Sequence, residues 1–320
     1  MAVSEEVLKR ITQLEEKFQA SGQDLVSYLD GLLYSDYLTY WDYVHLDTLL
    51  SLQQPKTGFP DEHIFIMYHQ VTELFFKMAL HEMEQIAAKG PDAKFMIERL
   101  GRVNRYFGVL TQSYSVMVDG MDLEQFRKYR MSLLPASGFQ SAQYRMIEIY
   151  ATDFLRLVDK DHRERLAARK DATIEDLFEF IYWKAGATEL ATGKKTLTLE
   201  QFERKYSADL IALAKNNKHS NMVALYHQLP AADQQNEELI RTLRLLDINV
   251  NINWPLAHYK SAVRYLHKSP EDIAATGGTN WQKYLPPRFQ KRIFYPELWS
   301  PEELENWGRS WVEELQAKRK

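Results

Sequence analysis

An arginine just ahead of a Ser-Gly turn is the feature of this chain with the clearest chemical use. Arg130 stands seven residues before Ser137-Gly138, and a polar helix start, Gln140-Ser141, follows directly. A guanidinium held in a cavity binds a ligand carboxylate through two parallel hydrogen bonds, because its planar fork matches the carboxylate. A structural arginine paired with an acid of the fold is the alternative, and this segment alone leaves both interpretations open.

A second segment places a histidine between aromatic residues on one face of a helix predicted over residues 61–88. Phe65, His69, Thr72 and Phe76 share this face at helical spacing. A neutral imidazole accepts a hydrogen bond, so the face is a candidate pocket wall, with a satisfied core histidine as the alternative. A neighbouring stripe is expected to be ordinary core: Ile64, Met67, Tyr68, Val71, Leu74, Phe75 and Met78.

Together these segments resemble the tryptophan 2,3-dioxygenase family of haem enzymes. The resemblance spans roughly residues 36 to 285 and is weak in the section of about 155 to 235. It rests on Phe65-Ile-Met-Tyr-His69-Gln70, on Ser137-Gly138-Phe-Gln-Ser141, on the run Leu38–Gln53 and on Thr276-Gly277-Gly278. The first two motifs are specific when they occur together, whereas Thr-Gly-Gly alone is weak.

The resemblance implies a role for each residue around the substrate. Phe65 packs on an indole ring and His69 faces the indole N–H. Arg130 holds the amino-acid carboxylate, and Phe126, one turn earlier, flanks the indole. The resemblance also implies that Leu133, Ser137 and Gly138 lie near the haem face where oxygen binds.

Three further residues carry an implied role and a plainer alternative. Thr276 lies where the family closes over the ammonium and carboxylate of the ligand, although such a segment read alone is a linker. Tyr40 and Tyr43 match aromatic residues that enter the pocket from a neighbouring subunit. A core tyrosine pair at helical spacing is the other interpretation of these two.

The haem needs a proximal ligand, and the chain has nine histidines. In the family the ligand follows a tryptophan by four residues, usually with an arginine directly after the tryptophan. Trp254-Pro255-Leu-Ala-His258 has this spacing, with proline in place of arginine. The interval from His258 to Thr276 is also longer than in the family. His258 is therefore the predicted ligand of a b-type haem, with Trp254 beside it and His267 as the second candidate.

Helical periodicity runs through nearly the whole sequence and predicts an all-α, multi-helix bundle that encloses the haem. One domain over 1–320 is expected, with a small helical insertion at about 155–235. The predicted helices cover residues 4–33 with a break at Gly22, 38–54, 61–88 with Asp61 as N-cap, 93–117, 122–133, 139–167, 173–184, 198–215, 219–228, 235–252, a helix after an interruption at Pro255, and 301–317.

Composition excludes several classes of function. The chain of 320 residues has a net charge of −4, which argues against general nucleic-acid binding. Without cysteine it has no disulfide, thiolate-bound haem or cysteine nucleophile, and the absence fits a reducing cytoplasm. No signal peptide and no run of about 18 apolar residues is present. Glu-x-x-His, His-Glu-x-x-His and a phosphate-binding glycine loop are also missing, against di-iron, zinc-hydrolase and nucleotide sites.

The function implied by the resemblance is dioxygenation of L-tryptophan. Dioxygen adds across the pyrrole double bond, and both atoms end in N-formylkynurenine, the first product of tryptophan catabolism through the kynurenine pathway. A homotetramer in the cytoplasm is expected. Two alternatives remain: a haem enzyme of the same scaffold that hydroxylates or oxygenates another aromatic amino acid, and a haem-binding protein without turnover.

Overall fold

The chain forms helices throughout the residues that its structure describes. The computed structural model describes residues 3–35, 38–130, 139–188, 192–265 and 287–308. In these ranges extended pairing is limited to two isolated bridges, Val158 with Ile181 and Thr188 with Lys195. The predicted all-α class is confirmed. Two compact units are present, Met1–Gln54 and Pro55–Lys320, and the insertion predicted at about 155–235 stays a prediction.

The first unit contains four helices. They are α1 (Glu5–Ala20), α2 (Leu25–Leu33), α3 (Tyr40–Tyr43) and α4 (Leu46–Leu50). The break expected at Gly22 is confirmed, because Gly22 has φ +67°, which glycine adopts without a Cβ clash. The single helix predicted over 38–54 is wrong: His45, in the left-handed region at φ 51°, separates α3 from α4.

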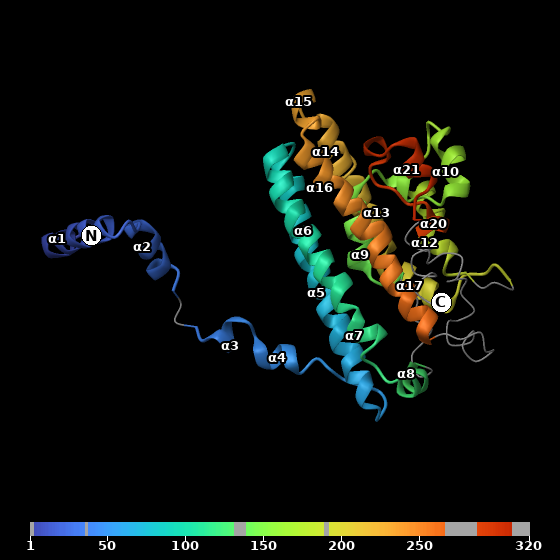
Figure 1. Cartoon of the computed structure of the whole chain (residues 1–320), viewed down its shortest axis with the longest axis horizontal. Coiled ribbons are helices and arrows are strands. Elements are labelled where there is room, and N and C mark those ends of the chain that lie inside the picture. Colours follow the sequence, from blue (N-terminus) through green and yellow to red (C-terminus); the bar gives the residue numbers. More distant parts are fainter. Residues whose placement is uncertain (1–2, 36–37, 131–138, 189–191, 266–286, 309–320) are drawn as a thin grey trace. The chain divides into compact units, whose positions relative to one another are not determined.

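The second unit is built around long helices (Figure 1). Its elements are α5 (Pro60–Lys89), α6 (Ala93–Ser113), α7 (Ser115–Val118), α8 (Leu123–Arg130), α9 (Ala142–Ala151), η1 (Phe154–Leu157), α10 (Lys160–Ala167), α11 (Ile174–Glu179), α12 (Tyr182–Ala185), α13 (Leu197–Asn216), α14 (Met222–Gln228), α15 (Ala231–Gln234), α16 (Glu237–Ile248), η2 (Asn249–Asn253), α17 (Trp254–Tyr265), α20 (Pro287–Gln290), η3 (Pro296–Leu298) and α21 (Pro301–Glu305). Helix α5 packs against α6 and α9, α16 packs against α6, and α13 packs against α9.

Helix α5 begins one residue earlier than the sequence predicted. Phe59 is the N-cap and Pro60 occupies the first turn, where a missing N–H costs no helical hydrogen bond. Asp61 is therefore not the cap, and its carboxylate instead accepts from the Asp122 amide at 2.6 Å. Buried Glu62 accepts from the amides of Lys56 and Thr57 at 2.8 and 2.7 Å, which holds the entry to α5 in place.

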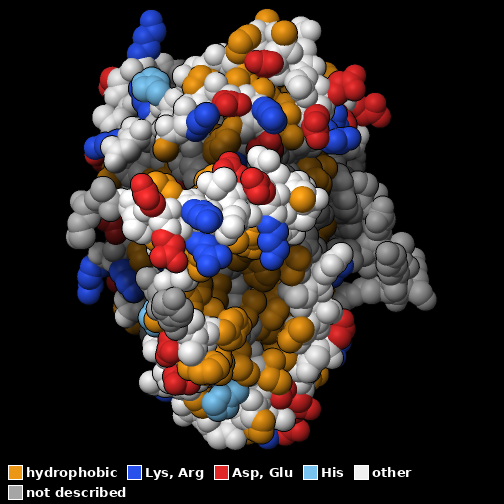
Figure 2. Space-filling view, turned by 90° about the vertical axis from the view of Figure 1, so that its left-hand side faces the viewer, with side chains coloured by type: hydrophobic (Ala, Val, Ile, Leu, Met, Phe, Trp, Pro, Cys, Tyr) orange, Lys and Arg blue, Asp and Glu red, His pale blue; other side chains and the backbone are white. Residues whose placement is uncertain are grey.

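The stripe of α5 predicted to be core is wrong for four of its seven residues. Met67, Val71, Leu74 and Met78 are each more than 40% exposed. The buried stripe lies about a third of a turn away, and it consists of Tyr68, Thr72, Phe76, Ala79, Met83 and Ile86. The apolar residues of 79–86 define the true inward face. Hydrophobic side chains thus reach the surface, among charged ones, on the face shown in Figure 2.

The helix predicted over 139–167 is interrupted in the structure. Helix α9 ends at Ala151, and Thr152 has extended backbone, with its hydroxyl donating to the Phe294 carbonyl at 2.9 Å. Asp153 then caps η1 and Asp159 caps α10. Competition between the Thr and Asp side chains and the helical backbone explains the break. None of the described helices is both long and apolar enough to cross a membrane.

Helices α16 and α17 continue one another in a single line (Figure 1). The interruption expected at Pro255 is wrong, because the chain stays helical through it. The π-helical segment η2 joins the two helices, and the Trp254 amide donates to the Asn249 carbonyl, five residues back. Pro255 is buried in the first turn of α17. This compound helix carries His258.

Candidate functional site

A continuous series of aromatic rings leads from α17 to α5 and α8. The centroid of the His258 ring lies 4.7 Å from that of Tyr114 and 4.7 Å from that of Trp254. Tyr114 is 5.8 Å from Tyr68, and the next residue on α5 is His69. Rings packed at these distances in tilted or edge-on arrangements stabilise one another and exclude water from the surface they cover. We call this set, with Phe65, Phe126 and Tyr129, the aromatic array.

The far end of the aromatic array contains the residues that the sequence assigned to the substrate. The rings of Phe65 and His69 are 4.1 Å apart, and Phe65 is 6.3 Å from Phe126. The Arg130 guanidinium lies 5.5 Å from the centre of the Phe126 ring, as expected for residues one turn apart on α8. Four residues predicted from the sequence are therefore brought together from two helices.

The protonation of His69 follows from its contacts. Its Nδ1 is 2.7 Å from the Phe65 carbonyl oxygen, which only accepts, so Nδ1 carries the proton and Nε2 carries a lone pair. The ring remains accessible to solvent, yet the surrounding protein atoms lower its pKa by desolvation, and the charge of Arg130 lowers it further. His69 thus presents a neutral acceptor on the accessible side of α5.

Arg130 is a partly buried cation at the end of α8. Burial lowers the pKa of its guanidinium, and the neighbouring Tyr114 and Tyr129 oppose this shift. Arginine stays protonated even so, because its reference pKa is far above neutrality. A partly desolvated guanidinium binds an anion more strongly than one in water, since the local dielectric constant is lower.

His258 has the properties of a metal ligand. Burial lowers the pKa of its imidazole to about 3, so the ring is neutral. Its Nδ1 is buried and has no hydrogen-bond partner in the described part of the chain. A neutral imidazole with unused hydrogen-bonding capacity suits coordination of iron, which fits a haem held by one histidine. No group of three histidine, aspartate or glutamate side chains gathers as a metal site within the described ranges.

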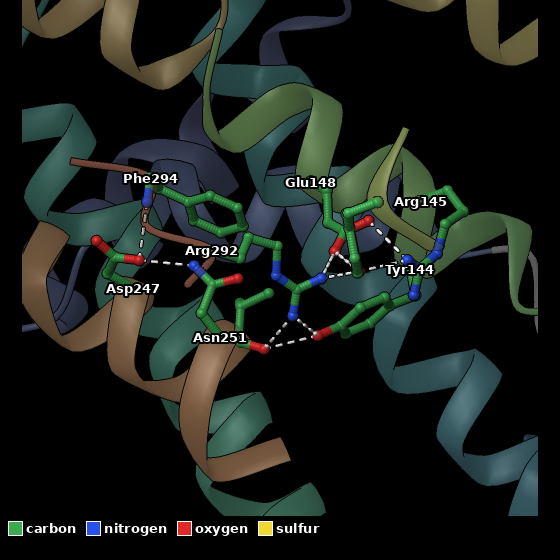
Figure 3. Close-up of polar contacts among 9 residues, drawn as sticks. Tyr144, Arg145, Glu148, Asp247, Asn251, Arg292 and Phe294 are labelled. Carbon is green, nitrogen blue, oxygen red and sulfur yellow. Dashed lines mark hydrogen bonds and ion pairs between the residues drawn. The ribbon is translucent and has the colours of Figure 1, made fainter. Parts of the chain in front are cut away.

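A second cluster, made of buried charged and polar groups, also contacts this compound helix. Arg292 donates to Glu148 and Tyr182, and Arg145 forms an ion pair with Glu148 at 3.0 Å (Figure 3). Burial raises the pKa of the Glu148 carboxyl to about 8, and the charge of Arg145 opposes the shift. Tyr144 also belongs to this cluster. We call the five residues Tyr144, Arg145, Glu148, Tyr182 and Arg292 the polar cluster.

Comparison with known proteins relates this arrangement to a family. The family model described as tryptophan 2,3-dioxygenase matches residues 30–177, the range that contains Phe65, His69, Phe126 and Arg130. The chain is 29% identical to the tryptophan 2,3-dioxygenase of Bacillus cereus (strain ZK / E33L) over 83% of this chain and 92% of that protein. The chain is also 29% identical to the tryptophan 2,3-dioxygenase of Herpetosiphon aurantiacus, over 83% of this chain and 98% of that protein.

A third relative matches over a shorter range. The tryptophan 2,3-dioxygenase of Ruegeria sp. (strain TM1040) is 41% identical over 36% of this chain and 42% of that protein. Over most of its length the chain is therefore similar to tryptophan 2,3-dioxygenases. The resemblance inferred from the motifs is therefore confirmed.

Several residues that the family resemblance singles out cannot be compared with the structure. Leu133, Ser137, Gly138, Thr276 and His267 all lie outside the described residues. Tyr40 and Tyr43 are described, in α3 of the first unit, and their side chains are 72% and 74% exposed. The core interpretation of these two tyrosines and their contribution to a neighbouring site both stay predictions.

The sequence analysis of this chain missed three residues of the aromatic array. Tyr68 was assigned to ordinary core, and Tyr114 and Tyr129 were not considered. Tyr68 donates from its hydroxyl to the Leu110 carbonyl at 3.4 Å and lies near the Ser113 hydroxyl at 3.1 Å, so it is both core and array. The position of Tyr129, directly before Arg130, was an available signal. Tyr114 caps the junction of α6 and α7, which periodicity alone does not reveal.

Proposed function

We propose that the chain is a haem-dependent tryptophan 2,3-dioxygenase, which opens the pyrrole ring of L-tryptophan with dioxygen and yields N-formylkynurenine. The aromatic array carries the proposal: one end has a neutral histidine whose Nδ1 has no hydrogen-bond partner among the described residues, and the other end has Phe65 near Phe126, with Arg130 over the Phe126 ring. An aromatic amino acid has a flat ring and a carboxylate, and those two groups match the phenylalanines and the arginine. The similarity to tryptophan 2,3-dioxygenases supports the same activity.

His258 would hold the haem through its imidazole, with Trp254 packed beside it. Haem, when bound, supplies the activation of dioxygen, which no side chain of this protein provides. The neutral state of His258 is what iron coordination requires, because a protonated ring has no free lone pair. Ser137, Gly138 and Leu133 remain proposed neighbours of the haem, and Thr276 a proposed contact of the substrate.

Phe65, Phe126, His69 and Arg130 would bind and orient the substrate. The two phenylalanine rings would lie on either side of the indole, and Arg130 would bind the carboxylate through two parallel N–H groups. Nε2 of His69 accepts the indole N–H, because Nδ1 is committed to the Phe65 carbonyl. Indole N–H is a very weak acid, so His69 acts by positioning it and not by removing its proton. Fixed orientation of the reacting ring lowers the entropic part of the barrier.

We further propose a homotetramer in which Tyr40 and Tyr43 complete the site of a neighbouring subunit. Helices α1 and α2 bury none of their residues, and Leu29, Leu32 and Leu33 are 38%, 69% and 75% exposed. Apolar surface of this kind marks an association site. Deletion of residues 1–36 is then expected to produce smaller species in sedimentation together with lower activity. A fully active monomer would remove the shared-site proposal.

Two smaller assignments complete the proposal. A cytoplasmic location rests on the absence of cysteine, and the lack of nucleic-acid partners rests on the net charge of −4. L-Tryptophan and dioxygen are the proposed small-molecule partners.

Anaerobic reconstitution tests the function. Purified protein is loaded with haem, reduced, mixed with L-tryptophan and then exposed to oxygen, and the ultraviolet band of the kynurenine-type product is followed. The mass of the product separates the alternatives, because dioxygenation adds two oxygen atoms and hydroxylation adds one. Stable haem binding without any product would instead identify a haem carrier, and L-phenylalanine serves as the matched control substrate.

A further inference from the structure

The compound helix that carries His258 has a gap in its backbone hydrogen bonds. The π-helical register of η2 is seen at its end, where the Trp254 amide donates to the Asn249 carbonyl five residues earlier. The next donor in this register would be residue 255 and the next acceptor Val250. Residue 255 is a proline and has no N–H. Val250 is fully buried, so water does not satisfy its carbonyl, and an unpaired buried carbonyl is costly.

Two side chains from other elements supply the missing donors. The Tyr144 hydroxyl, from α9, donates to the Val250 carbonyl at 2.6 Å, and the Arg292 Nη2 donates to it at 3.3 Å. The same Nη2 also donates to the Tyr144 hydroxyl oxygen at 3.3 Å. Figure 3 shows Arg292 between Glu148 and Tyr144, beside η2. The Val250 carbonyl thus joins the polar cluster to the helix of His258.

The hydrogen-bond register of η2 determines where His258 points. An α-helix turns by about 100° per residue, so the extra residue accommodated in a π-helical segment rotates all later side chains by about that angle. In the observed register His258 lies against Tyr114 and Trp254, with both centroid distances 4.7 Å. A purely α-helical path through 249–255 would move the imidazole away from these rings.

We propose that Tyr144 and Arg292 are positioning residues for the haem ligand, which act by binding the Val250 carbonyl that Pro255 leaves without a donor. This inference rests on the proposed function, since it takes His258 as the ligand. Neither residue touches the substrate or the iron. Their effect passes through the register of η2 to the orientation of the His258 ring, and Pro255 makes the two side chains necessary.

A double-mutant cycle tests the proposal. Tyr144→Phe removes only the hydroxyl, and Pro255→Ala restores an N–H that donates to the Val250 carbonyl. In the Pro255 background, Tyr144→Phe should speed haem transfer to apomyoglobin about tenfold, the factor for a hydrogen bond of about 1.4 kcal/mol. It should also shift the iron–histidine stretching band of the ferrous protein. In the Pro255→Ala background the same change should alter the transfer rate by less than about twofold.

The control is a tyrosine with the same chemistry elsewhere. The Tyr226 hydroxyl donates to the Gln234 carbonyl at 2.9 Å, between α14 and α15. Tyr226→Phe should leave the iron–histidine band unchanged. Equal effects of Tyr144→Phe in both backgrounds, or the same band shift with Tyr226→Phe, would overturn the proposal.

The two proposals fail in different ways. Wild-type protein that binds no haem would refute the proposed function before any variant is made. In that case the free energies of unfolding in urea are measured for the wild type, Tyr144→Phe, Pro255→Ala and the double variant, and they give the coupling between Tyr144 and Pro255. Equal losses of stability in both backgrounds in that measurement would also refute the role of the Val250 carbonyl.

Discussion

The aromatic array and the polar cluster both contact one compound helix and bury different groups, aromatic rings in the first and charged side chains in the second. In the polar cluster the Glu148 carboxylate contacts both Arg292 and Arg145, although the Nε atoms of the two arginines have no hydrogen-bond partner among the described residues. The Asp247 carboxylate accepts from the amides of Phe294 and Tyr295 at 2.9 and 3.1 Å and from the Trp299 indole at 3.0 Å. In the aromatic array His258 is neutral and its Nδ1 is unpartnered among the described residues.

The contrast separates a region built for stability and register from one built for a ligand. Buried charges need partners, so a cluster of paired charges specifies one arrangement of the helices that supply them. In the array, the Nδ1 of His258 has no partner among the described residues and is available to a bound molecule. Substitutions in the polar cluster should therefore change stability or haem geometry, whereas substitutions in the array should change binding and turnover. The following predictions test this division.

The largest effect is expected at the haem ligand. His258→Ala should abolish the Soret band of the reconstituted ferrous protein, or convert it to that of a weakly ligated haem, because no other array residue supplies an imidazole at that place. His267→Ala should leave the spectrum unchanged. Absorption spectra of the two variants decide the assignment, and the reverse pattern would make His267 the ligand.

Loss of a buried charge partner should be the most damaging change in the polar cluster. Arg292→Ala leaves Glu148, which is 1% exposed, with Arg145 as its remaining cation. Removal of one partner of a buried pair costs about 3–5 kcal/mol in free energy of unfolding. Urea denaturation measures the loss. Arg169→Ala, which breaks an exposed pair with Asp171, is the control and should leave the free energy of unfolding nearly unchanged.

Arg130 should affect turnover and leave stability nearly unchanged. Removal of the guanidinium from a charge-assisted pair costs about 2–5 kcal/mol, so Arg130→Ala should lower kcat/KM for L-tryptophan by roughly 30-fold or more. Arg130→Lys should rescue poorly, because lysine lacks the planar fork. Lys128→Ala, on the exposed side of the same helix, is the matched control. Near-normal efficiency in Arg130→Ala would contradict its role in carboxylate binding.

The smallest effect is a pH dependence at Asp247. Burial raises the pKa of this carboxyl to about 6, above its ordinary value of 3.8, although four hydrogen bonds oppose the shift. Between these values the unfolded chain has released a proton that the folded chain retains, so unfolding becomes easier as pH rises from about 4 to about 6. Above about 6 the contribution is constant.

Comparison with Asp247→Asn isolates this titration. The free energy of unfolding of the wild type, minus that of Asp247→Asn, should fall by about 2–3 kcal/mol over the same interval, at about 1.4 kcal/mol per pKa unit. Urea unfolding at a series of pH values gives this difference. A difference that stays flat or rises with pH would show that the hydrogen bonds outweigh burial.

Sequence reasoning succeeded where local patterns determine the outcome. Helix existence followed from periodicity, the pairing of Phe65 with His69 followed from helical spacing, and the selection of Phe126 and Arg130 followed from the family resemblance. The polar cluster was invisible to it, because Glu148 and Arg292 are 144 residues apart and neither belongs to a motif. The passage of the helix through Pro255 was missed for the same reason: the donors that replace the proline N–H come from distant elements.

The position of Arg292 in the chain has a consequence for biosynthesis. At about 5–20 residues per second, the 144 residues between Glu148 and Arg292 take about 7–29 s to translate. During that interval the nascent chain already contains Glu148 and Tyr144, and later Val250, without their guanidinium partner. The Arg292 contacts to Glu148, Tyr182 and the Val250 carbonyl therefore form only after residue 292 has been synthesised, whereas the Tyr144 contact to that carbonyl can form earlier.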